Sequence, residues 1–256
     1  MADMIRTSSL TKRFDGLVAV NDVSISLRQN QISGVIGPNG SGKTTLFNLL
    51  SGFFPPSNGS IVYNEEDITE MSSFQRVHKG IVRTFQLVSV FDSLKVWENL
   101  VLSTNWIKSV DSKHPNFYFS SIRKKSVKDK CMEALECVGL TDKAEATTDS
   151  LSYGDKRMLE IGISLSLNPK ILLLDEPLAG LSEHEIAQVI ELIKKFEDKF
   201  TIVIIEHKIS KIIDIVHSLH VMNAGRLICE GNPHTVINDE KVRECYWGKE
   251  GTNCLM

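Results

Sequence analysis

The segment Gly37-Pro38-Asn39-Gly40-Ser41-Gly42-Lys43-Thr44 combines the residue types that hold a phosphate chain. Its three glycines allow left-handed turns without a Cβ clash, so that successive backbone N–H groups can point inward at phosphate oxygens. Lys43 supplies a point charge for the β and γ phosphates, and the hydroxyl of Thr44 can coordinate a Mg²⁺ ion that bridges them. This spacing predicts that the chain binds a nucleoside triphosphate.

Two flanking elements must position this loop. The apolar run Ile32–Ile36 precedes it and predicts a strand, and a helical pattern over 45–50 follows, ended by a cluster of breakers at 52–56. A strand, a glycine-rich loop and a helix in this order are the context that a phosphate loop requires. The helix N-terminus adds the positive end of a dipole, and we expect nucleotide contacts from Gly37 through Thr45.

A second candidate site follows another apolar run. Residues 171–174 predict a buried strand, and Asp175 and Glu176 come directly after it. Ligands of open α/β sheets bind at this end of the strands, where Asp175 could hold Mg²⁺ through a water molecule. Glu176 could orient or deprotonate an attacking water. An acidic pair seen alone is more often a loop or helix cap, but the upstream phosphate loop favours the catalytic interpretation.

Composition excludes several classes of function. The 256 residues suffice for one or two domains of about 150 residues each. The formal charge of −3, from 29 basic and 32 acidic residues, gives no reason to expect a nucleic-acid partner. The five cysteines form no close Cys-x-x-Cys pair, which fits reduced thiols in the cytosol. No apolar run approaches the ~18 residues of a membrane span, and no signal-peptide pattern is present, so a membrane role would require a partner.

Two regions of the chain predict the sheets. Residues 18–27 alternate apolar and polar side chains, which suits antiparallel strands with one solvated face. Residues 59–86 add a strand pair and a short helix. The runs 171–174 and 201–205 are wholly apolar and flank a helical pattern over 184–196. They predict a βαβ unit in a buried parallel sheet.

The stretch between these regions has a different character. Amphipathic helical patterns cover 93–101 and 124–138, and a polar segment containing aromatic residues joins them at 106–119. A helical insertion explains this better than a separate domain. We expect one domain over 1–256, with the nucleotide-binding core and a β subdomain in 1–86 and 160–256, and a helical subdomain in 87–159.

A third element, Leu-Ser-Tyr-Gly-Asp at 151–155, leads into a helical pattern over 158–167 and, seen alone, is a helix start near Asp155 with a serine near the cap position. With the two sites above, it makes the chain resemble the ABC ATPase family, whose signature is Leu-Ser-Gly-Gly-Gln. The order of motifs in that family is matched along nearly the whole chain by the phosphate loop, Gln86, 151–155, Asp175-Glu176 and His207. The resemblance implies an α/β fold with a P-loop NTPase, RecA-like core, an N-terminal antiparallel β subdomain and an inserted α-helical subdomain.

The resemblance assigns roles to individual residues and implies ATP and Mg²⁺ as cofactors. Phe14 matches the aromatic residue that stacks on adenine, although a lone phenylalanine is more often part of a core. Gln86 matches the glutamine that contacts Mg²⁺ and water, and His207 matches the histidine that touches the γ-phosphate. Ser152 and the backbone N–H of Gly154, beside a helix N-terminus, match a surface that binds the γ-phosphate of another subunit.

That last role implies a head-to-tail dimer with a second ATP-binding subunit, identical or related. ATP favours the closed dimer because it contacts both subunits only in that state. The chain departs from the family pattern at three positions. Tyr153 replaces the first signature glycine, Asp155 replaces the glutamine, and Ser182 stands where the following D-loop usually ends in aspartate.

A narrower resemblance rests on Val-Arg-Thr-Phe-Gln at 82–86, Leu-Ser-Tyr-Gly at 151–154, Ala-Gly-Leu at 179–181 and Tyr-Trp-Gly at 246–248. These segments are similar to the ATP-binding subunits of branched-chain amino acid importers, a subfamily shared with urea and short-amide importers. The resemblance implies transmembrane permease subunits, an extracytoplasmic solute-binding protein and a place at the cytoplasmic face of the cell membrane. The unusually apolar segment 87–94 would, where exposed, suit a groove for a helix of such a permease.

Two alternatives stay open at this point. A soluble ABC ATPase of repair, translation or iron–sulfur assembly would often carry a long coiled coil, a second cassette or metal-ligand cysteines, and the sequence shows none of these. A GTP switch would carry an Asn-Lys-x-Asp motif, which Asn168-Pro169-Lys170 does not match.

Overall fold

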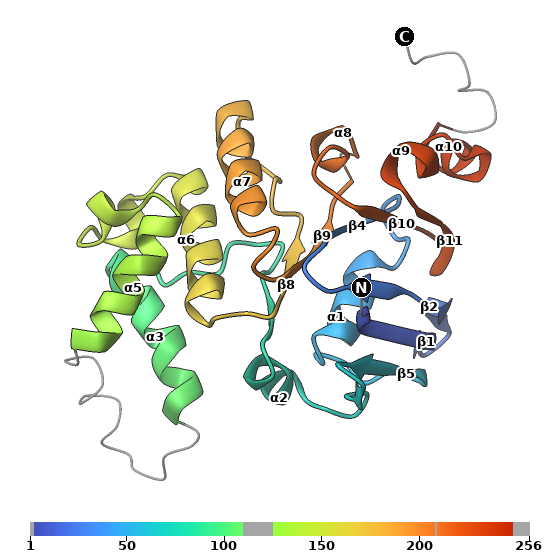
Figure 1. Ribbon diagram of the computed structural model, residues 1–256, viewed down its shortest axis with the longest axis horizontal. Coiled ribbons are helices and arrows are strands. Elements are labelled where there is room, and N and C mark those ends of the chain that lie inside the picture. The colour runs from blue at the N-terminus through green and yellow to red at the C-terminus, as the bar shows by residue number, and fades with distance from the viewer. Residues whose placement is uncertain (1–2, 110–124, 208, 248–256) are drawn as a thin grey trace.

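The computed structural model describes residues 3–109, 125–207 and 209–247, which form two β-sheets and the helices that cover them (Figure 1). The strands are β1 (Asp3–Phe14), β2 (Leu17–Val23), β3 (Ser26–Arg28), β4 (Ile32–Ile36), β5 (Asn58–Tyr63), β6 (Glu66–Asp67), β7 (Ile81–Arg83), β8 (Ile171–Asp175), β9 (Thr201–Ile205), β10 (Ser218–Asn223) and β11 (Arg226–Gly231). The α-helices are α1 (Lys43–Leu50), α2 (Ser73–His78), α3 (Val96–Ser109), α5 (Lys125–Cys137), α6 (Tyr153–Ser166), α7 (Glu183–Lys195), α8 (Ile209–Ile212), α9 (Pro233–Val236) and α10 (Glu240–Trp247).

The larger sheet has six strands in the order β11-β10-β4-β9-β8-β7. All neighbours in it are parallel except β11, which runs antiparallel to β10 at one edge. Strands β4, β8 and β9 are buried along their whole length, as continuous apolar runs in a covered parallel sheet should be. The predicted βαβ unit is confirmed, since β8 and β9 pair directly and α7 connects them.

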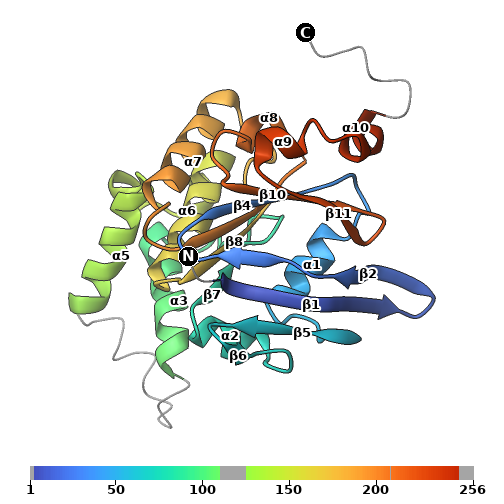
Figure 2. The same ribbon diagram turned by 45° about the vertical axis from the view of Figure 1, so that its right-hand side comes forward.

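The smaller sheet is antiparallel, in the order β2-β1-β5-β6, with β3 also paired to β1. Figure 2 shows its strands β1, β2 and β5 as a layer separate from that of β4, β8 and β10. Helix α1 is buried between the layers: its Phe47 and Leu50 share one core with Leu10 of the antiparallel sheet and with Val35 and Leu173 of the parallel sheet. The helix that follows the phosphate loop is therefore held from both sides.

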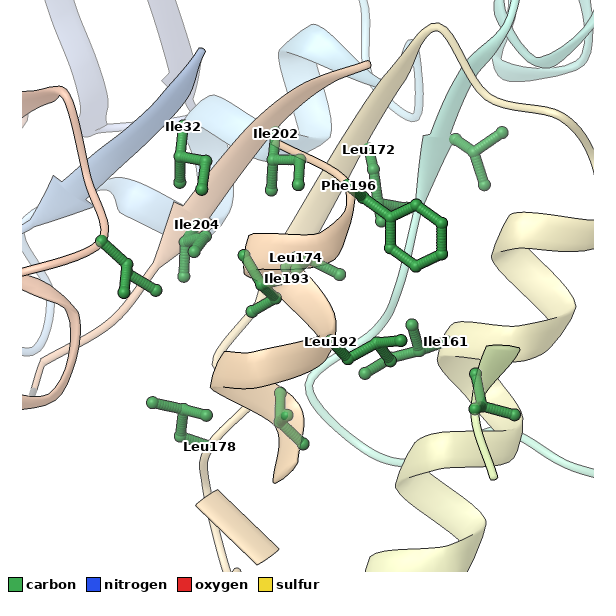
Figure 3. Close-up of a cluster of buried hydrophobic side chains, with 14 of the residues drawn as sticks. Ile32, Ile161, Leu172, Leu174, Leu178, Leu192, Ile193, Phe196, Ile202 and Ile204 are labelled. Atoms are coloured by element: carbon green, nitrogen blue, oxygen red, sulfur yellow. The ribbon is translucent and has the colours of Figure 1, made fainter. Parts of the chain in front are cut away.

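The opposite face of the parallel sheet is covered by α7 (Figure 3). Ile32, Leu174 and Ile204 point from the strands toward Ile193 and Phe196. Because side chains alternate along a strand, their neighbours Val35, Leu173 and Val203 face α1 instead. Each fully buried aliphatic side chain contributes about 1.5–3 kcal/mol to such a core.

Helices α3, α5 and α6 pack on one another to one side of the parallel sheet (Figure 1). The chain enters this helical group after β7 and leaves it before β8. The predicted boundary at 159 falls within α6, and the division into subdomains stays a prediction. Helix α5 matches the predicted range of 124–138 closely. Helix α3 begins at Val96 because the Glu98 carboxylate accepts from the N–H of Lys95, and it runs eight residues beyond the predicted end at 101. Part of the predicted joining segment, 110–119, lies outside the described residues.

Candidate functional site

The phosphate loop joins the end of β4 to the start of α1 and is closed by its own backbone. The Ser41 N–H donates to the Pro38 carbonyl oxygen at 3.1 Å. The Lys43 ammonium group turns back over the loop and donates to the carbonyl oxygens of Gly37 at 2.8 Å and Pro38 at 3.1 Å. Burial lowers the pKa of Lys43, whereas the carboxylates of Glu176 and Asp175 oppose that change. The charge of this lysine is thus placed beside the predicted acidic pair.

At two positions of the loop, only glycine fits. The φ angle of Gly37 is 155°, and a Cβ atom there would lie 2.2 Å from the carbonyl oxygen of Met222. The φ angle of Gly42 is 101°, and a Cβ atom would lie 2.4 Å from the carbonyl oxygen of Ala19. The chemistry of the loop therefore depends on close packing against the strand ends around it.

This loop lines a cleft of about 600 Å³ at the carboxyl edge of the parallel sheet. The hydroxyl oxygen of Ser41 is buried there without a hydrogen-bond partner in the described part of the chain. Together with the N-terminus of α1, this suits a bound anion. The residues lining the cleft are Leu17, Val18, Ala19, Asn39, Gly40, Ser41, Gly42, Lys43, Thr44, Thr45, Gln86, Glu176, Ala224 and Gly225.

Three predicted catalytic residues from separate strand ends meet at this edge. Glu176 follows β8, and its carboxylate accepts from the Gln86 amide at 3.0 Å. Its other oxygen lies 3.5 Å from Nδ1 of His207, which follows β9. Glu176 also has a left-handed φ of 48°, a conformation that costs a non-glycine residue about 1–3 kcal/mol. Such strain is retained where a side chain must be aimed, here toward the phosphate cleft.

Asp175 has a cationic partner that the sequence pattern does not reveal. Its carboxylate accepts from the Arg83 guanidinium at 2.7 Å, and both side chains are buried. Arg83 also donates to the Asn48 side chain of α1 at 2.5 Å, so it links β7, β8 and the phosphate-loop helix. The sequence signal that could have found this partner is Arg83 itself, a charged residue at the end of the otherwise apolar strand β7. The Arg83–Asp175 pair fixes the orientation of the aspartate.

The residues around Asp175 fit a divalent cation. The second carboxylate oxygen, Oδ1, is buried and has no hydrogen-bond partner among the described residues. The hydroxyl of Thr44 and the amide of Gln86 line the adjacent cleft. Carboxylate, hydroxyl and amide oxygens are the donors that Mg²⁺ prefers.

Phe14 is the last residue of β1, beside the turn into β2, and it does not line the cleft. Its side chain is 38% exposed, and its ring packs edge-on against Phe54 with a centroid separation of 5.4 Å. The Lys12 ammonium lies 5.2 Å from the ring centroid. Leu17, its partner across the hairpin, does line the cleft and was not predicted. Stacking of Phe14 on adenine stays a prediction.

The signature segment does not line the cleft of its own chain. Ser152 is the N-cap of α6, as its place near the cap position predicts, and it accepts from the Asp155 N–H at 3.1 Å, so the helix begins at Tyr153, two residues before the start expected near Asp155. Ser182 similarly caps α7, in a reciprocal pair of hydrogen bonds with Glu185. The serine that replaces the usual aspartate thus has a local role as a helix cap.

A phosphate loop after β4, a glutamine after β7, an acidic pair at the end of β8 and a histidine after β9 converge at one sheet edge, beside a helical group that carries Leu-Ser-Tyr-Gly. This combination defines an ATP-binding cassette. Within 3–109, 125–207 and 209–247, no helix is long and apolar enough to cross a membrane.

Comparison with known proteins agrees with this class. The profile of a family described as ABC transporter matches residues 20–179. The chain is 36% identical over 253 residues to the high-affinity branched-chain amino acid transport ATP-binding protein LivG of Salmonella typhimurium, covering 96% of this chain and 98% of that protein. It is also 36% identical over 254 residues to BraF of Pseudomonas aeruginosa, a protein of the same description, with the same coverage. The ADP conformation of MJ1267, an ATP-binding cassette of an ABC transporter, superposes with a TM-score of 0.86 at 30% identity, covering 97% of this chain and all of that one.

The chain therefore belongs to the ABC transporter family, as an ATP-binding subunit with the ATPase fold. The predicted fold class is confirmed by the two sheets and by the structural likeness. The enzyme class, an ATP hydrolase of the ABC type, agrees with the same findings.

Proposed function

We propose that this chain hydrolyses ATP to power an importer of branched-chain amino acids or related small polar solutes. The observation that carries the hydrolytic part is the meeting of Gln86, Glu176 and His207 beside the phosphate loop. The names of LivG and BraF, which describe branched-chain amino acid transport, support the substrate class. The alternative of a soluble cassette without a membrane partner has no feature of the described residues in its favour.

The loop N–H groups and Lys43 bind the phosphate chain, with the γ-phosphate toward Glu176. Asp175 through Oδ1, Thr44 and Gln86 would hold Mg²⁺, which would neutralise charge on the β and γ oxygens. Glu176 orients a water against the γ-phosphorus; as the water oxygen bonds to phosphorus, the bond to the β–γ bridging oxygen breaks and ADP leaves. The water proton passes to the carboxylate and then to phosphate. His207, whose Nδ1 lies 3.5 Å from the Glu176 carboxylate, stabilises the γ oxygens.

Each site is completed by a second chain in this proposal. Ser152 is exposed at the N-terminus of α6 and does not line the cleft of its own chain, so it can meet a nucleotide held elsewhere. Gly154 is buried beside the Glu185 carboxylate, which must move aside before the Gly154 N–H can bind an anion. A head-to-tail pair of ATP-binding subunits, identical or related, brings these two residues to the γ-phosphate of the partner. Binding of ATP by both subunits then stabilises the closed pair.

A membrane partner is supported by apolar side chains next to the catalytic glutamine. Phe85, Leu87 and Phe91 are exposed, with 79% of Leu87 accessible, whereas Val90 of the same segment packs against the core. Exposed apolar side chains in one segment favour a surface that receives a helix. We propose that transmembrane permease subunits dock here at the cytoplasmic face of the cell membrane, with an extracytoplasmic solute-binding protein delivering the solute.

The catalytic assignment is tested with Glu176→Gln. We expect the purified variant to bind ATP with Mg²⁺ as tightly as the unaltered chain, to hydrolyse it at least ~100-fold more slowly, and to accumulate as an ATP-bound dimer. The control is Glu66→Gln, which changes an exposed carboxylate in the antiparallel sheet and should leave the rate unaltered. Unchanged hydrolysis by Glu176→Gln would remove Glu176 from the mechanism.

The transport assignment is tested by isolating the chain from membranes of its source cells. Copurification with two polytopic subunits, and loss of leucine uptake when the gene is deleted, are the expected results. Loss of urea uptake instead would move the substrate class to short amides. Recovery of a purely soluble assembly would reject the role in transport.

A further inference from the structure

The carboxyl group of Glu206 is buried at the sheet edge that carries the site, and the proposed mechanism does not use it. Glu206 follows β9 and is 1% exposed, yet it does not line the nucleotide cleft. Its carboxylate accepts from the N–H of Leu178 at 3.0 Å. Leu178 is 2% exposed and belongs to the apolar core covered by α7, so its N–H is shielded from water (Figure 3). Glu206 therefore pairs with a main-chain donor that apolar neighbours could not satisfy.

Leu178 lies in the turn that carries Glu176. The turn is closed by a hydrogen bond from the Ala179 N–H to the Glu176 carbonyl oxygen at 3.1 Å. The Glu176 N–H donates in turn to the carbonyl oxygen of Ile205, at the end of β9, at 3.0 Å. The bond from Leu178 to Glu206 is a second link between this turn and the same strand end. The main chain around Glu176 is thus tied to the end of β9 at two points.

Glu176 needs such support because its backbone is strained. Its φ of 48° lies in the left-handed region, which a glutamate keeps only where the surrounding structure holds it there. If the turn relaxed to a negative φ, the Glu176 carboxylate would leave its contacts with Gln86 at 3.0 Å and His207 at 3.5 Å. A carboxylate is among the stronger acceptors for a backbone N–H. Glu206 therefore supplies a restraint at the place where the backbone is strained.

Stability alone does not account for a carboxyl group at this position. Burial raises the pKa of Glu206, although the hydrogen bond from Leu178 opposes the rise. Taking a carboxylate out of water costs free energy that an apolar side chain of similar volume does not cost. What the carboxylate adds is a fixed acceptor for one N–H, two residues after Glu176.

We infer that Glu206 is a positioning residue, which holds the turn after β8 so that Glu176 stays aimed into the nucleotide cleft. It acts through the main chain of Leu178 and does not contact the nucleotide. This role rests on the proposed catalysis by Glu176, but the hydrogen bond that it requires can be measured separately from hydrolysis.

Two substitutions in the full chain separate the hydrogen bond from the charge. Glu206→Gln keeps an oxygen acceptor at the same reach and removes the charge. Glu206→Asp keeps the charge, but its side chain is shorter by one C–C bond, about 1.5 Å, and cannot make the 3.0 Å contact. At saturating ATP, we expect Glu206→Gln to keep kcat within about threefold of normal and Glu206→Asp to lower kcat at least ~10-fold. Both should bind ATP with Mg²⁺ within about threefold of the normal affinity, because the phosphate loop is unaltered.

Hydrogen–deuterium exchange measures the bond itself. In the nucleotide-free chain, the Leu178 amide should exchange at least ~10-fold faster in Glu206→Asp than in the unaltered chain. In Glu206→Gln, exchange of this amide should stay within about threefold of that of the unaltered chain, because an acceptor is still present.

Thr7→Val is the matched control. Thr7 is 2% exposed, and its hydroxyl oxygen accepts from the main-chain N–H of Ile25 at 3.0 Å in the antiparallel sheet. This variant should lower the midpoint of thermal unfolding and keep kcat within about twofold, because no strained residue of the site depends on it.

The role of Glu206 is overturned if Glu206→Asp keeps its kcat or its slow Leu178 exchange. It is also overturned if Glu206→Gln loses as much of kcat as Glu206→Asp, or if Thr7→Val does. Unchanged hydrolysis by Glu176→Gln would instead reject the proposed catalysis by Glu176, and the exchange of the Leu178 amide would still report whether Glu206 holds the turn.

Discussion

Replacing Arg83 by methionine removes the cation that faces the buried carboxylate of Asp175. The two side chains are 7% and 1% exposed, and their charged atoms lie 2.7 Å apart. Breaking such a pair on one side leaves an uncompensated buried charge, which costs about 3–5 kcal/mol. Arg83 also donates to Asn48 and lies over the Phe47 ring, contacts worth about 1 kcal/mol each. We expect Arg83→Met to lose about 5–7 kcal/mol of the roughly 5–15 kcal/mol that stabilises a domain.

Urea unfolding of the nucleotide-free chain measures this loss, and a double-mutant cycle isolates the share that Asp175 carries. The double variant Arg83→Met, Asp175→Asn removes both charges, so it should recover more than half of the loss. The exposed pair of Lys79 and Glu66 is the control, and Lys79→Met should cost under about 1 kcal/mol. The reasoning is refuted if Arg83→Met costs no more than Lys79→Met, or if the two substitutions at the buried pair are simply additive.

Further predictions concern the phosphate loop and the start of α7. Gly42→Ala should weaken ATP binding at least ~10-fold in a titration, because the added Cβ would meet the Ala19 carbonyl oxygen. A Cβ added at Gly40 would meet no atom, so Gly40→Ala should bind ATP more tightly than Gly42→Ala. Equal affinities would contradict this. Ser182→Ala should destabilise the chain by about 1 kcal/mol at pH 7 in urea unfolding, since it removes the α7 cap. Hydrogen bonds from Ser182 lower the pKa of Glu185 in the folded chain. Their contribution to stability is therefore present at neutral pH and is lost as acidification protonates Glu185. A difference in stability between Ser182→Ala and the unaltered chain that grows in acid would contradict this.

The sequence predicted the parts of the site that depend on local pattern. The phosphate loop, the strands β8 and β9 and the acidic pair were found because apolar runs and glycine spacing depend on the residues themselves. The serine near the cap position placed the start of α6 near Asp155, but the local pattern does not mark Arg157 and Glu160 as buried, because these charged residues interrupt the apolar periodicity of its first turns. Those residues are buried only because the main chain at Phe85 and Gln86 satisfies them, and that contact spans more than 70 positions.

Arg83 was missed for a related reason. Its pairing with Asp175 depends on β7 and β8 being neighbours in the sheet, and the order of strands is not written in either strand. Phe14 is assigned by resemblance alone; its ring packs on Phe54, and its stacking on adenine stays a prediction. Tertiary contacts between distant segments decide such cases.

Complementation between two inactive variants tests most directly whether each ATP site is built from two chains. Lys43→Ala removes the charge of the phosphate loop and keeps the signature segment, whereas Ser152→Arg blocks the signature segment and keeps the loop. Each variant alone should be inactive. In an equal mixture half of the dimers are mixed and each has one intact site, so hydrolysis should return to about a quarter of the normal rate. Full activity of Ser152→Arg alone, or a mixture that stays inactive although mixed dimers form, would contradict the composite site.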